Sequence, residues 1–372
     1  MLSIKGRIQL QLSINNKEFP FDRVNALDFL HMSSSVRLSL PMIHFKVLDA
    51  ARWLSKEQDL VDGATIQVAV SVLDEKVVYP FRLHTFRETL SSTGPAYEID
   101  GYFDSVAYWL LSTPLHIKGT SNFALNKIAT TCQIANYSGT PTADDQLWIS
   151  KNKQYRTFAK DIMERGYVNE TSCMQLAFDL NGTLIYKNLS EKRTKVAQFI
   201  TSKYQSNSFI VTDFRIKSNS GFLNSVSGYA DEVHAQSLGT NDTFNKVTAT
   251  PLTSRMMVNT DVNKTVARGR VSFAPIDGGN THDNYEKAFY QNMRLSNLFS
   301  FGLEIVTPDV TNLALLDYIS YEAKIANKEK VSAYSGEYYI TSKAIYIQGI
   351  NYYEKFELVR QGIQTSSKNL ES

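Results

Sequence analysis

The sequence predicts a β-rich α+β fold with two antiparallel β-barrels and an inserted α+β domain. Two long hairpin signals, at 335–360 and 81–103, are rich in aromatic and β-branched residues. A further strand signal precedes each hairpin, at 316–322 and 62–70. Because the same outline occurs near each terminus, the chain is predicted to contain a duplicated β-domain.

The composition excludes several classes of function. The chain has 372 residues, enough for two or three domains, and its 39 basic and 37 acidic side chains nearly cancel. No strong overall field therefore favours nucleic acid or anionic lipid. Cys132 and Cys173 lack the spacing of a metal site or disulfide framework and are predicted to be small core residues. We expect no signal peptide or membrane anchor, and assembly in a reducing cytoplasm.

The first barrel is predicted to span 1–103. Residues 3–15 alternate as one strand, with Ile4, Ile8, Leu10, Leu12 and Ile14 on one face and Lys5, Arg7, Gln9, Gln11 and Ser13 on the other. Val36, Leu38 and Leu40 indicate a second strand before Pro41. The segment 47–54 is predicted to be a short helix, and strands at 62–72 and 77–103 complete the barrel.

The middle of the chain, 104–197, changes to helical periodicity. Apolar residues at helical spacing predict helices at 121–134, behind a Ser121 N-cap, and at 155–165, before Gly166. The dipeptide Asn181-Gly182, between alternating residues, predicts a hairpin over 174–186. These elements predict a separate α+β domain.

The second barrel is predicted to be interrupted. Strand signals at 208–216 and 226–229 begin it, and strands from 301 onward close it. The intervening sequence is poor in apolar pattern over 236–280 and could form a helix over 281–299. The predicted boundaries are 198–235 and 300–363 for the two parts of the barrel, 236–299 for the insertion and 364–372 for a flexible tail.

No residue pattern predicts catalysis, a cofactor or a metal. The histidines are scattered without metal spacing: His31, His44, His84, His116, His234 and His282. His282-Asp283, with Asp277 nearby, is interpreted as a turn and cap. The acidic pairs Glu98/Asp100 and Asp144/Asp145 are interpreted as solvent-facing carboxylates, and the basic clusters at 151–156, 192–195 and 268–270 as solvated edges and linkers.

Tyrosine is abundant, with 20 copies. Tyr339, Tyr346 and Tyr353 are predicted on the polar side of their strands, where half-polar rings suit either a protein interface or a barrel rim. Together with Lys5, Arg7 and Gln9 on the outer face of the first strand, they form the predicted interface.

The order of these features resembles the baseplate hub proteins of contractile-tailed bacteriophages, a group that includes late-control tail proteins and the hub part of type VI secretion spikes. The resemblance lies in YEIDGYFDSVAYWLL (97–111), YRTFAKDIMERGY (155–167), FDLNGTLIYKNL (178–189), SGEYYI (335–340) and FELVRQG (356–362). One departure is Leu316-Asp317, where many relatives have Gly-Asp.

The resemblance implies barrels like tail-tube subunits and a homotrimer whose six barrels adapt a six-fold tail tube to a three-fold central spike. It implies an axial channel through which DNA or a tape measure passes, and contacts with tail tube, spike and baseplate wedge proteins. It implies no catalytic residues and no cofactor, and a place in the virion baseplate. Two alternatives stay open: a tail-associated cell-wall hydrolase or glycan-binding tip using 236–280, and the hub of a tailocin or type VI-like particle.

Overall fold

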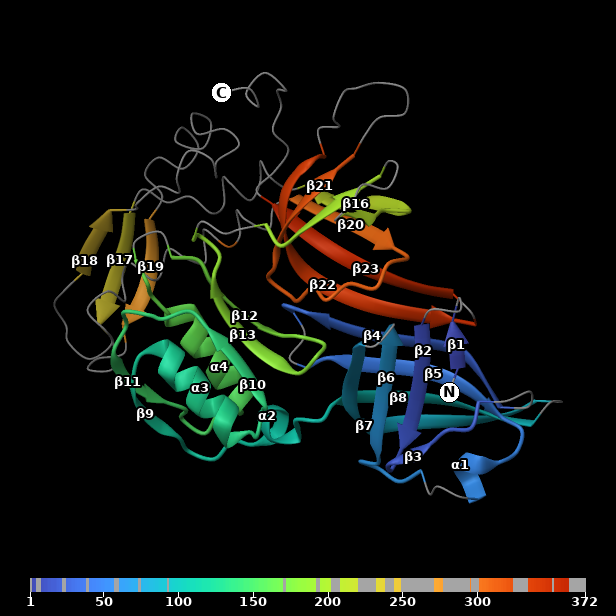
Figure 1. The fold of residues 1–372 in the computed structure, drawn as a ribbon. Coiled ribbons are helices and arrows are strands. Elements are labelled where there is room, and N and C mark those ends of the chain that lie inside the picture. The colour runs from blue at the N-terminus through green and yellow to red at the C-terminus, as the bar shows by residue number, and fades with distance from the viewer. Residues whose placement is uncertain are drawn as a thin grey trace.

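The structure of the chain is a computed structural model (Figure 1). It describes residues 2–4, 8–21, 25–37, 40–56, 60–72, 75–91, 94–169, 172–191, 195–201, 208–219, 232–237, 244–248, 271–276, 295, 301–323, 334–349 and 351–360.

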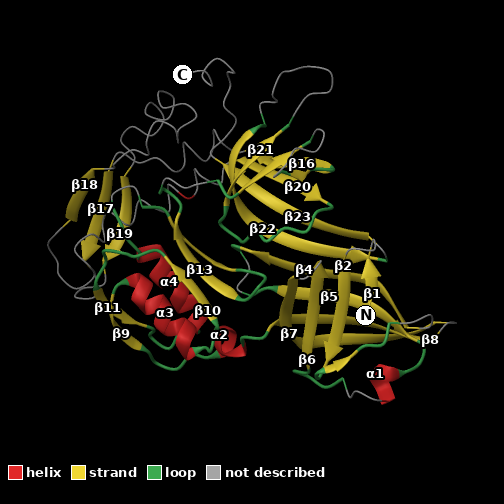
Figure 2. Cartoon of the chain, viewed as in Figure 1, coloured by secondary structure: helices red, strands yellow, loops and turns green. Residues whose placement is uncertain are grey.

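Strands dominate the described residues, and the helices are few and short (Figure 2). The strands of the first half are β1 (Leu2–Ile4), β2 (Ile8–Ile14), β3 (Lys17–Glu18), β4 (Asn25–Ser35), β5 (Met42–Asp49), β6 (Thr65–Val72), β7 (Glu75–Ser91) and β8 (Gly94–Phe103). Those that follow are β9 (His116–Gly119), β10 (Asn136–Gly139), β11 (Gln146–Ile149), β12 (Met174–Phe178), β13 (Thr183–Asn188), β14 (Ala197–Ile200), β15 (Phe209–Ile210), β16 (Asp213–Asn219), β17 (Glu232–Ser237), β18 (Phe244–Thr248), β19 (Val271–Ile276), β20 (Phe301–Thr307), β21 (Tyr318–Glu322), β22 (Gly336–Gln348) and β23 (Asn351–Arg360). The helices are α1 (Trp53–Lys56), α2 (Val106–Leu110), α3 (Ser121–Thr131) and α4 (Tyr155–Arg165).

One 15-stranded sheet runs through both halves of the chain. Its main path is β1-β2-β6-β7-β8-β5-β4-β22-β21-β14-β15, and β23, β20 and β16 branch from β22. Most pairs are antiparallel, but β14 lies parallel to β21 and β15, which makes the sheet mixed. The β-rich α+β class is therefore confirmed. Strand pairing within the described ranges closes neither half into the predicted barrel.

The two halves repeat one strand arrangement. The first half has the order β4-β5-β8-β7-β6 and the second has β16-β20-β23-β22-β21, with the strands in the same sequence order and all pairs antiparallel. The first strand of each hairpin also carries a bulge, between Leu83 and Thr85 in β7 and between Ile340 and Ser342 in β22. This correspondence agrees with the predicted duplication.

The core lies on the inward face of the large sheet and continues into the middle segment. In β2 and β5, alternate residues are buried, as the strand period of two requires. The ring of Phe103 at the end of β8 lies 5.1 Å from that of Phe178 in β12. The middle segment, 104–197, therefore packs directly on the first half. A second apolar cluster fills the later half, around Phe199, Phe301 and Phe356.

The N-terminal strand prediction was wrong in one respect. Residues 3–15 do not form one strand: β1 folds back on β2, with Ile4 opposite Ile8 and Leu2 opposite Leu10. Residues paired in an antiparallel hairpin lie on the same face of the sheet, and so do residues four apart in one continuous strand. The positions of Ile4 and Ile8 therefore share a face in either arrangement. Alternation alone could not detect the reversal.

Two further predictions in the first half were wrong. The strand expected around Val36 does not begin there, because β4 ends at Ser35 and a turn follows; Leu38 lies outside the described residues. The helix expected at 47–54 is strand β5 through Asp49, and α1 begins only at Trp53. A bulge between Leu27 and Phe29 breaks the alternation of β4. The inward residues therefore change parity within the strand, which hid its pattern.

The middle segment was predicted well. The structure confirms the helix at 155–165 and the hairpin around Asn181-Gly182, and the other helix ends at Thr131. Its N-cap is Thr120 rather than Ser121, because the Thr120 hydroxyl accepts from the Phe123 amide. Gly182 adopts φ 83°, as the turn requires.

In the second half, the strands expected near 208–216 and from 301 are confirmed as β15, β16 and β20. Strand β17 belongs to a small sheet with β18 and β19 rather than to the large sheet. The predicted strand at 226–229, the loop containing His282, and the tail at 364–372 lie outside the described residues. Of the predicted helix at 281–299, only Leu295 is described, and it is helical.

Candidate subunit interface

The two halves of the chain meet where β4 pairs with β22 (Figure 1). On the inward face, Leu30 lies opposite Ile347 and Met32 opposite Ile345, and all four side chains are at most 1% exposed. On the outward face, the ring of His31 stacks on Tyr346, with 4.3 Å between centroids. The junction is therefore apolar on its inward face and carries an aromatic stack on its outward face.

The equivalent edges of the repeat lack such a partner among the described strands. Strand β6 pairs with β7 only as far as Arg82, so residues 85–91 contact β8 on one side alone. Strand β16 pairs with β20 on one edge alone. Unpaired edges present free backbone donors and acceptors to another strand.

These edges carry exposed apolar side chains. Phe86 is 40% and Leu90 is 77% exposed on β7, while Phe214 is 43% and Ile216 is 41% exposed on β16. In both strands the apolar residues are two or four positions apart and so share one face. Large apolar side chains grouped on unpaired edges are typical of interaction sites.

The repeat shows which residues of the β4–β22 junction occupy the same positions as these four exposed residues. In the first half Ile99 lies opposite Phe86 and Phe45, and in the second half Phe356 lies opposite Lys343 and Ile305. Superposing the registers on Ile99 and Phe356 also aligns the two hairpin bulges. The pairs that then correspond are Phe86 with Lys343, Leu90 with Ile347, Phe214 with Leu30, and Ile216 with Met32. The exposed residues therefore stand at positions that are buried in the β4–β22 junction.

A cluster of charges covers the outward face beside β16. The carboxylate of Glu304 lies 3.1 Å from Arg215, 3.4 Å from Lys217 and 3.0 Å from Lys355. Burial alone would raise the pKa of Glu304, but bonds to Lys355, Lys217 and Arg215 outweigh it and lower that pKa. The cluster holds β16, β20 and β23 together across their polar side.

The acidic pair Glu98 and Asp100 has a structural role. The His44 ring lies between them, with Nδ1 2.7 Å from Asp100 and Nε2 3.3 Å from Glu98. On the neighbouring strand, burial, with smaller contributions from His44 and Lys355, lowers the pKa of His31. On this outward face, His44 thus pairs with both carboxylates.

Asp144 of the other acidic pair is buried rather than solvent-facing. Its carboxylate accepts from the backbone amides of Ser121 at 2.8 Å and Tyr167 at 2.7 Å. It thus fixes the start of α3 against the segment that follows α4.

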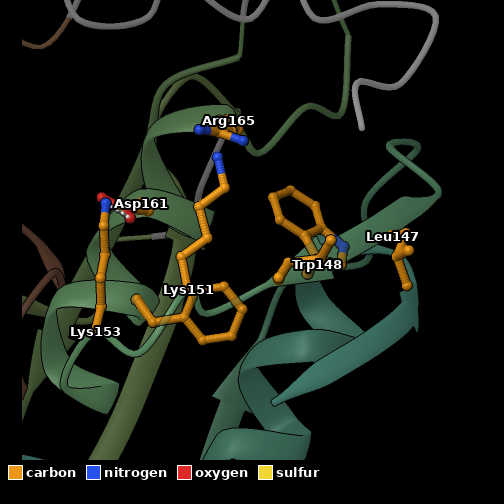
Figure 3. Close-up of a pocket in the computed structure, with 8 residues that line it drawn as sticks. Leu147, Trp148, Lys151, Lys153, Asp161 and Arg165 are labelled. Carbon is orange, nitrogen blue, oxygen red and sulfur yellow. Dashed lines mark hydrogen bonds and ion pairs between the residues drawn. The ribbon is translucent and has the colours of Figure 1, made fainter. Parts of the chain in front are cut away.

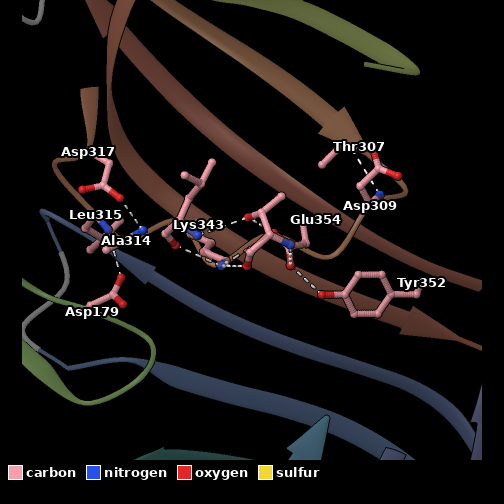
Figure 4. Close-up of polar contacts among 11 residues, drawn as sticks. Asp179, Thr307, Asp309, Ala314, Leu315, Asp317, Lys343, Tyr352 and Glu354 are labelled. Carbon is pink, nitrogen blue, oxygen red and sulfur yellow. Dashed lines mark hydrogen bonds and ion pairs between the residues drawn. The ribbon is translucent and has the colours of Figure 1, made fainter. Parts of the chain in front are cut away.

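The connection between β20 and β21 fastens the hairpin β22–β23 to the rest of the chain (Figure 4). The buried ammonium of Lys343 donates to the carbonyls of Thr311 and Leu313, both at 3.0 Å, and lies 3.6 Å from Glu354. Glu354 accepts from the hydroxyls of Thr311 and Tyr352, both at 2.6 Å. All the buried charges shown have partners.

The same connection contacts the middle segment. The carboxylate of Asp179 accepts from the Leu315 amide at 3.0 Å (Figure 4). In addition, Lys187 lies 3.1 Å from Asp317. Burial raises the pKa of Asp179, an effect partly offset by that amide and by Lys343. The turn of the β12–β13 hairpin is thereby bound to the second half.

The predicted interface residues fall in different places. Lys5 and Arg7 lie outside the described residues, and Gln9 is exposed on β2. Tyr346 and Tyr353 lie half-buried on the outward face, stacked at 5.0 Å. Tyr339 differs from these two: it is 8% exposed, and its hydroxyl donates to the Leu189 carbonyl at 2.6 Å.

Sequence reasoning missed the four exposed apolar residues of β7 and β16. In the sequence they alternate like core residues, and no local signal distinguishes an edge from an interior strand. The structure also assigns both cysteines to the core, where burial raises the pKa of the Cys132 thiol to about 12.

Within the ranges that the structure describes, no group of three or more His, Cys, Asp or Glu side chains could hold a metal ion. The described helices are all too short or too polar to cross a membrane.

Comparisons with known proteins identify the fold. No protein-family model matches the chain, and no curated protein matches it in sequence. The structure is similar to the tail protein from Neisseria meningitidis, with TM-score 0.61 and 12% identity over 96% of this chain and 98% of that one. It is also similar to the prophage MuSo2 43 kDa tail protein from Shewanella oneidensis, with TM-score 0.62 and 11% identity over 95% and 98%.

A more distant similarity is to a chain of the Francisella PdpA-VgrG complex, with TM-score 0.50 and 7% identity over 96% of this chain and 53% of that one. At these identities the comparisons establish the fold and not the activity. Over nearly its whole length, the chain has the fold of phage tail proteins.

Proposed function

We propose that the chain is a structural baseplate hub, a homotrimer that joins the six-fold tail tube to the three-fold central spike and leaves an axial channel for DNA or a tape measure. Its neighbours would be the tail tube, spike and baseplate wedge proteins, and its role would be mechanical rather than enzymatic. The fold similarity to two phage tail proteins supports this proposal.

The observation that carries the trimer is the repeated strand arrangement with its unpaired edges. In the proposed ring, the contact made within the chain by β4 and β22 recurs between chains, with β16 of one chain against residues 85–91 of the next. Phe214 then lies opposite Leu90, as Leu30 lies opposite Ile347 within the chain. Each chain supplies one of each edge, so the contact is head-to-tail and can close a ring.

The ring would contain two similar units from each chain and six in all. Three chains would therefore present near six-fold symmetry to a tube and three-fold symmetry to a spike. The buried Lys343–Glu354 pair and the Asp179–Leu315 bond support mechanical transmission, because they bind the hairpin, the connection and the middle segment together. Tyr346 and Tyr353 stay candidates for contact with a neighbour on the outward face.

The proposal is tested by the mass of the purified protein in light scattering, alone and with its spike protein. We expect three times the chain mass of 42.0 kDa in at least one condition. A monomer that stays apart from the spike would overturn the proposal. Turnover of isolated cell-wall sugars would instead favour a hydrolase.

A further inference from the structure

The short helix α2, where the chain enters the middle segment, exposes a group of apolar side chains. Val106 is 47%, Leu110 is 57% and Leu111 is 44% exposed. Val106 and Leu110 are four residues apart and lie on one side of the helix, and Leu111 follows directly. Helix α2 follows the last residues of β8, whereas residues 85–91 lie toward the hairpin turn at the other end of that strand (Figure 1). The apolar group is therefore separate from the proposed ring contact.

An aromatic and cationic stack borders these apolar side chains. The Trp109 ring on α2 lies 5.0 Å from the Tyr102 ring, and the guanidinium of Arg156 on α4 lies 4.3 Å from the centre of the same indole. The Tyr155 amide donates to the Leu111 carbonyl at 2.9 Å, which fixes the start of α4 beside α2. The two helices thus hold the apolar side chains and the arginine in one surface.

The outer edge of the Arg156 guanidinium is positioned for a carboxylate. Its planar face lies over the indole, and its Nε donates to the side-chain oxygen of Gln154 at 2.9 Å. Neither contact neutralises the charge, and no carboxylate in the described ranges forms an ion pair with Arg156. A guanidinium held by stacking on its face can bind a carboxylate through the nitrogens at its edge.

The opposite side of α4 differs in this respect. Phe158, Asp161 and Arg165 line a pocket of about 80 Å³ there (Figure 3). In that pocket Asp161 pairs with Lys153, and Arg165 has an interaction of its own. Because helical positions advance by about 100° per residue, these three side chains lie on the other side of the helix from Arg156. Arg156 therefore belongs to the α2 surface and not to the pocket.

We propose that this surface binds an amphipathic helix of a partner polypeptide. The apolar side of that helix packs on Val106, Leu110 and Leu111, and an acidic side chain beside it pairs with Arg156. The surface presents side chains and no strand edge, so it suits a helix, whose backbone bonds are internal, better than an extended segment. The charge of Arg156 supplies the preference for an acidic residue.

The test uses the full chain and a fluorescein-labelled, alanine-rich helical peptide with leucines at positions i, i+3, i+4 and i+7 and one glutamate beside them. We expect saturable binding by fluorescence anisotropy, weakened about tenfold or more by Leu110→Asp. Leu90→Asp is the matched control, because it places the same charge at another exposed leucine and should leave binding unchanged. A peptide with the same leucines spread around the helix should bind at least about tenfold more weakly.

The role of Arg156 is tested by a double-mutant cycle. Replacing the peptide glutamate with glutamine should weaken binding to the unaltered chain by about tenfold, and should make no difference to binding by Arg156→Gln. Lys127→Gln, at an exposed position on α3, should keep the full response to the peptide glutamate.

Four results would overturn the proposal. They are an absence of saturable peptide binding, an equal loss of binding in Leu90→Asp and Leu110→Asp, a glutamate effect that persists in Arg156→Gln, and equal or tighter binding of an extended peptide or of phosphatidylserine vesicles. Because the peptide changes leave the protein unaltered, a folding defect in a variant cannot produce the expected pattern. None of these results depends on whether the chain forms a trimer.

Discussion

Replacing Leu90 with aspartate separates ring formation from folding. Leu90 is 77% exposed in the single chain, so Leu90→Asp should change the free energy of unfolding of the monomer by less than about 0.5 kcal/mol. In the proposed ring the same side chain is buried against Phe214. Full burial of a leucine side chain contributes about 2 kcal/mol, which is a factor of about 30 for each contact between chains.

Three such contacts close the ring, so the trimer should lose about 6 kcal/mol, together with the cost of burying a carboxylate. Sedimentation velocity should show monomers at concentrations where the unaltered chain is trimeric, while circular dichroism shows an unchanged melting temperature. Leu110→Asp is the matched control, because Leu110 is 57% exposed on α2, away from both edges. A trimer that survives Leu90→Asp, or that Leu110→Asp disrupts equally, would refute the assigned edge.

A mixing experiment tests the direction of the contact. Leu90→Asp damages one edge and Phe214→Asp the other, so each variant alone should be monomeric. In an equal mixture, the intact β16 edge of the first can pair with the intact β7 edge of the second. A head-to-tail contact therefore predicts dimers that do not close, whereas a two-fold contact between identical patches predicts no such rescue.

Three further predictions concern the fold. Lys343→Met should lower the free energy of unfolding by about 3–5 kcal/mol in urea titrations, because it leaves Glu354 buried without a countercharge; a loss below about 1 kcal/mol would contradict the role of the pair. In the unaltered chain, the pKa of His31 is lowered on folding, so the unfolded chain binds a proton more readily than the folded chain and stability is lost as the pH falls below about 6.5. His31→Phe removes this group, so the melting temperature of the variant should fall less on acidification. Equal pH profiles of the two proteins would argue against this role of His31. Gly182→Ala should lower the melting temperature, since φ is 83° and an added Cβ would collide with the Phe103 ring; an unchanged value would show that the turn relaxes freely.

Local signals sufficed for the elements whose partners are close in sequence. The hairpin at Asn181-Gly182 and helix α4 follow from turn chemistry and periodicity within a few residues. The reversal between Ile4 and Ile8 was hidden because both arrangements give the same alternation. The bulge at Leu27 disguised β4 in the opposite way, by breaking an alternation that the strand otherwise keeps.

The candidate interface could not be predicted because it depends on long-range register. The pairing of Ser35 with Ser342 joins strands from opposite ends of the chain, and no local pattern encodes it. Phe214 and Leu90 resemble core residues in the sequence, and only the strand order shows that their edges have no partner among the described strands. Tyr339 was expected on the polar side of its strand, as a half-polar ring suited to a protein interface or a barrel rim, and its hydroxyl donates to the Leu189 carbonyl inside the chain.

The repeat also predicts how the contact between chains differs from the one within the chain. Within the chain, Ile345 lies opposite Met32; at the equivalent position between chains, Glu88 would lie opposite Ile216. A carboxylate beside an apolar partner weakens the contact and keeps the edge soluble before assembly. Glu88→Val should therefore strengthen the trimer by about 1–2 kcal/mol per contact, measured as a lower midpoint concentration for assembly, with more aggregation of the free monomer. An unchanged or higher midpoint would show that Glu88 does not face a neighbouring chain in this register.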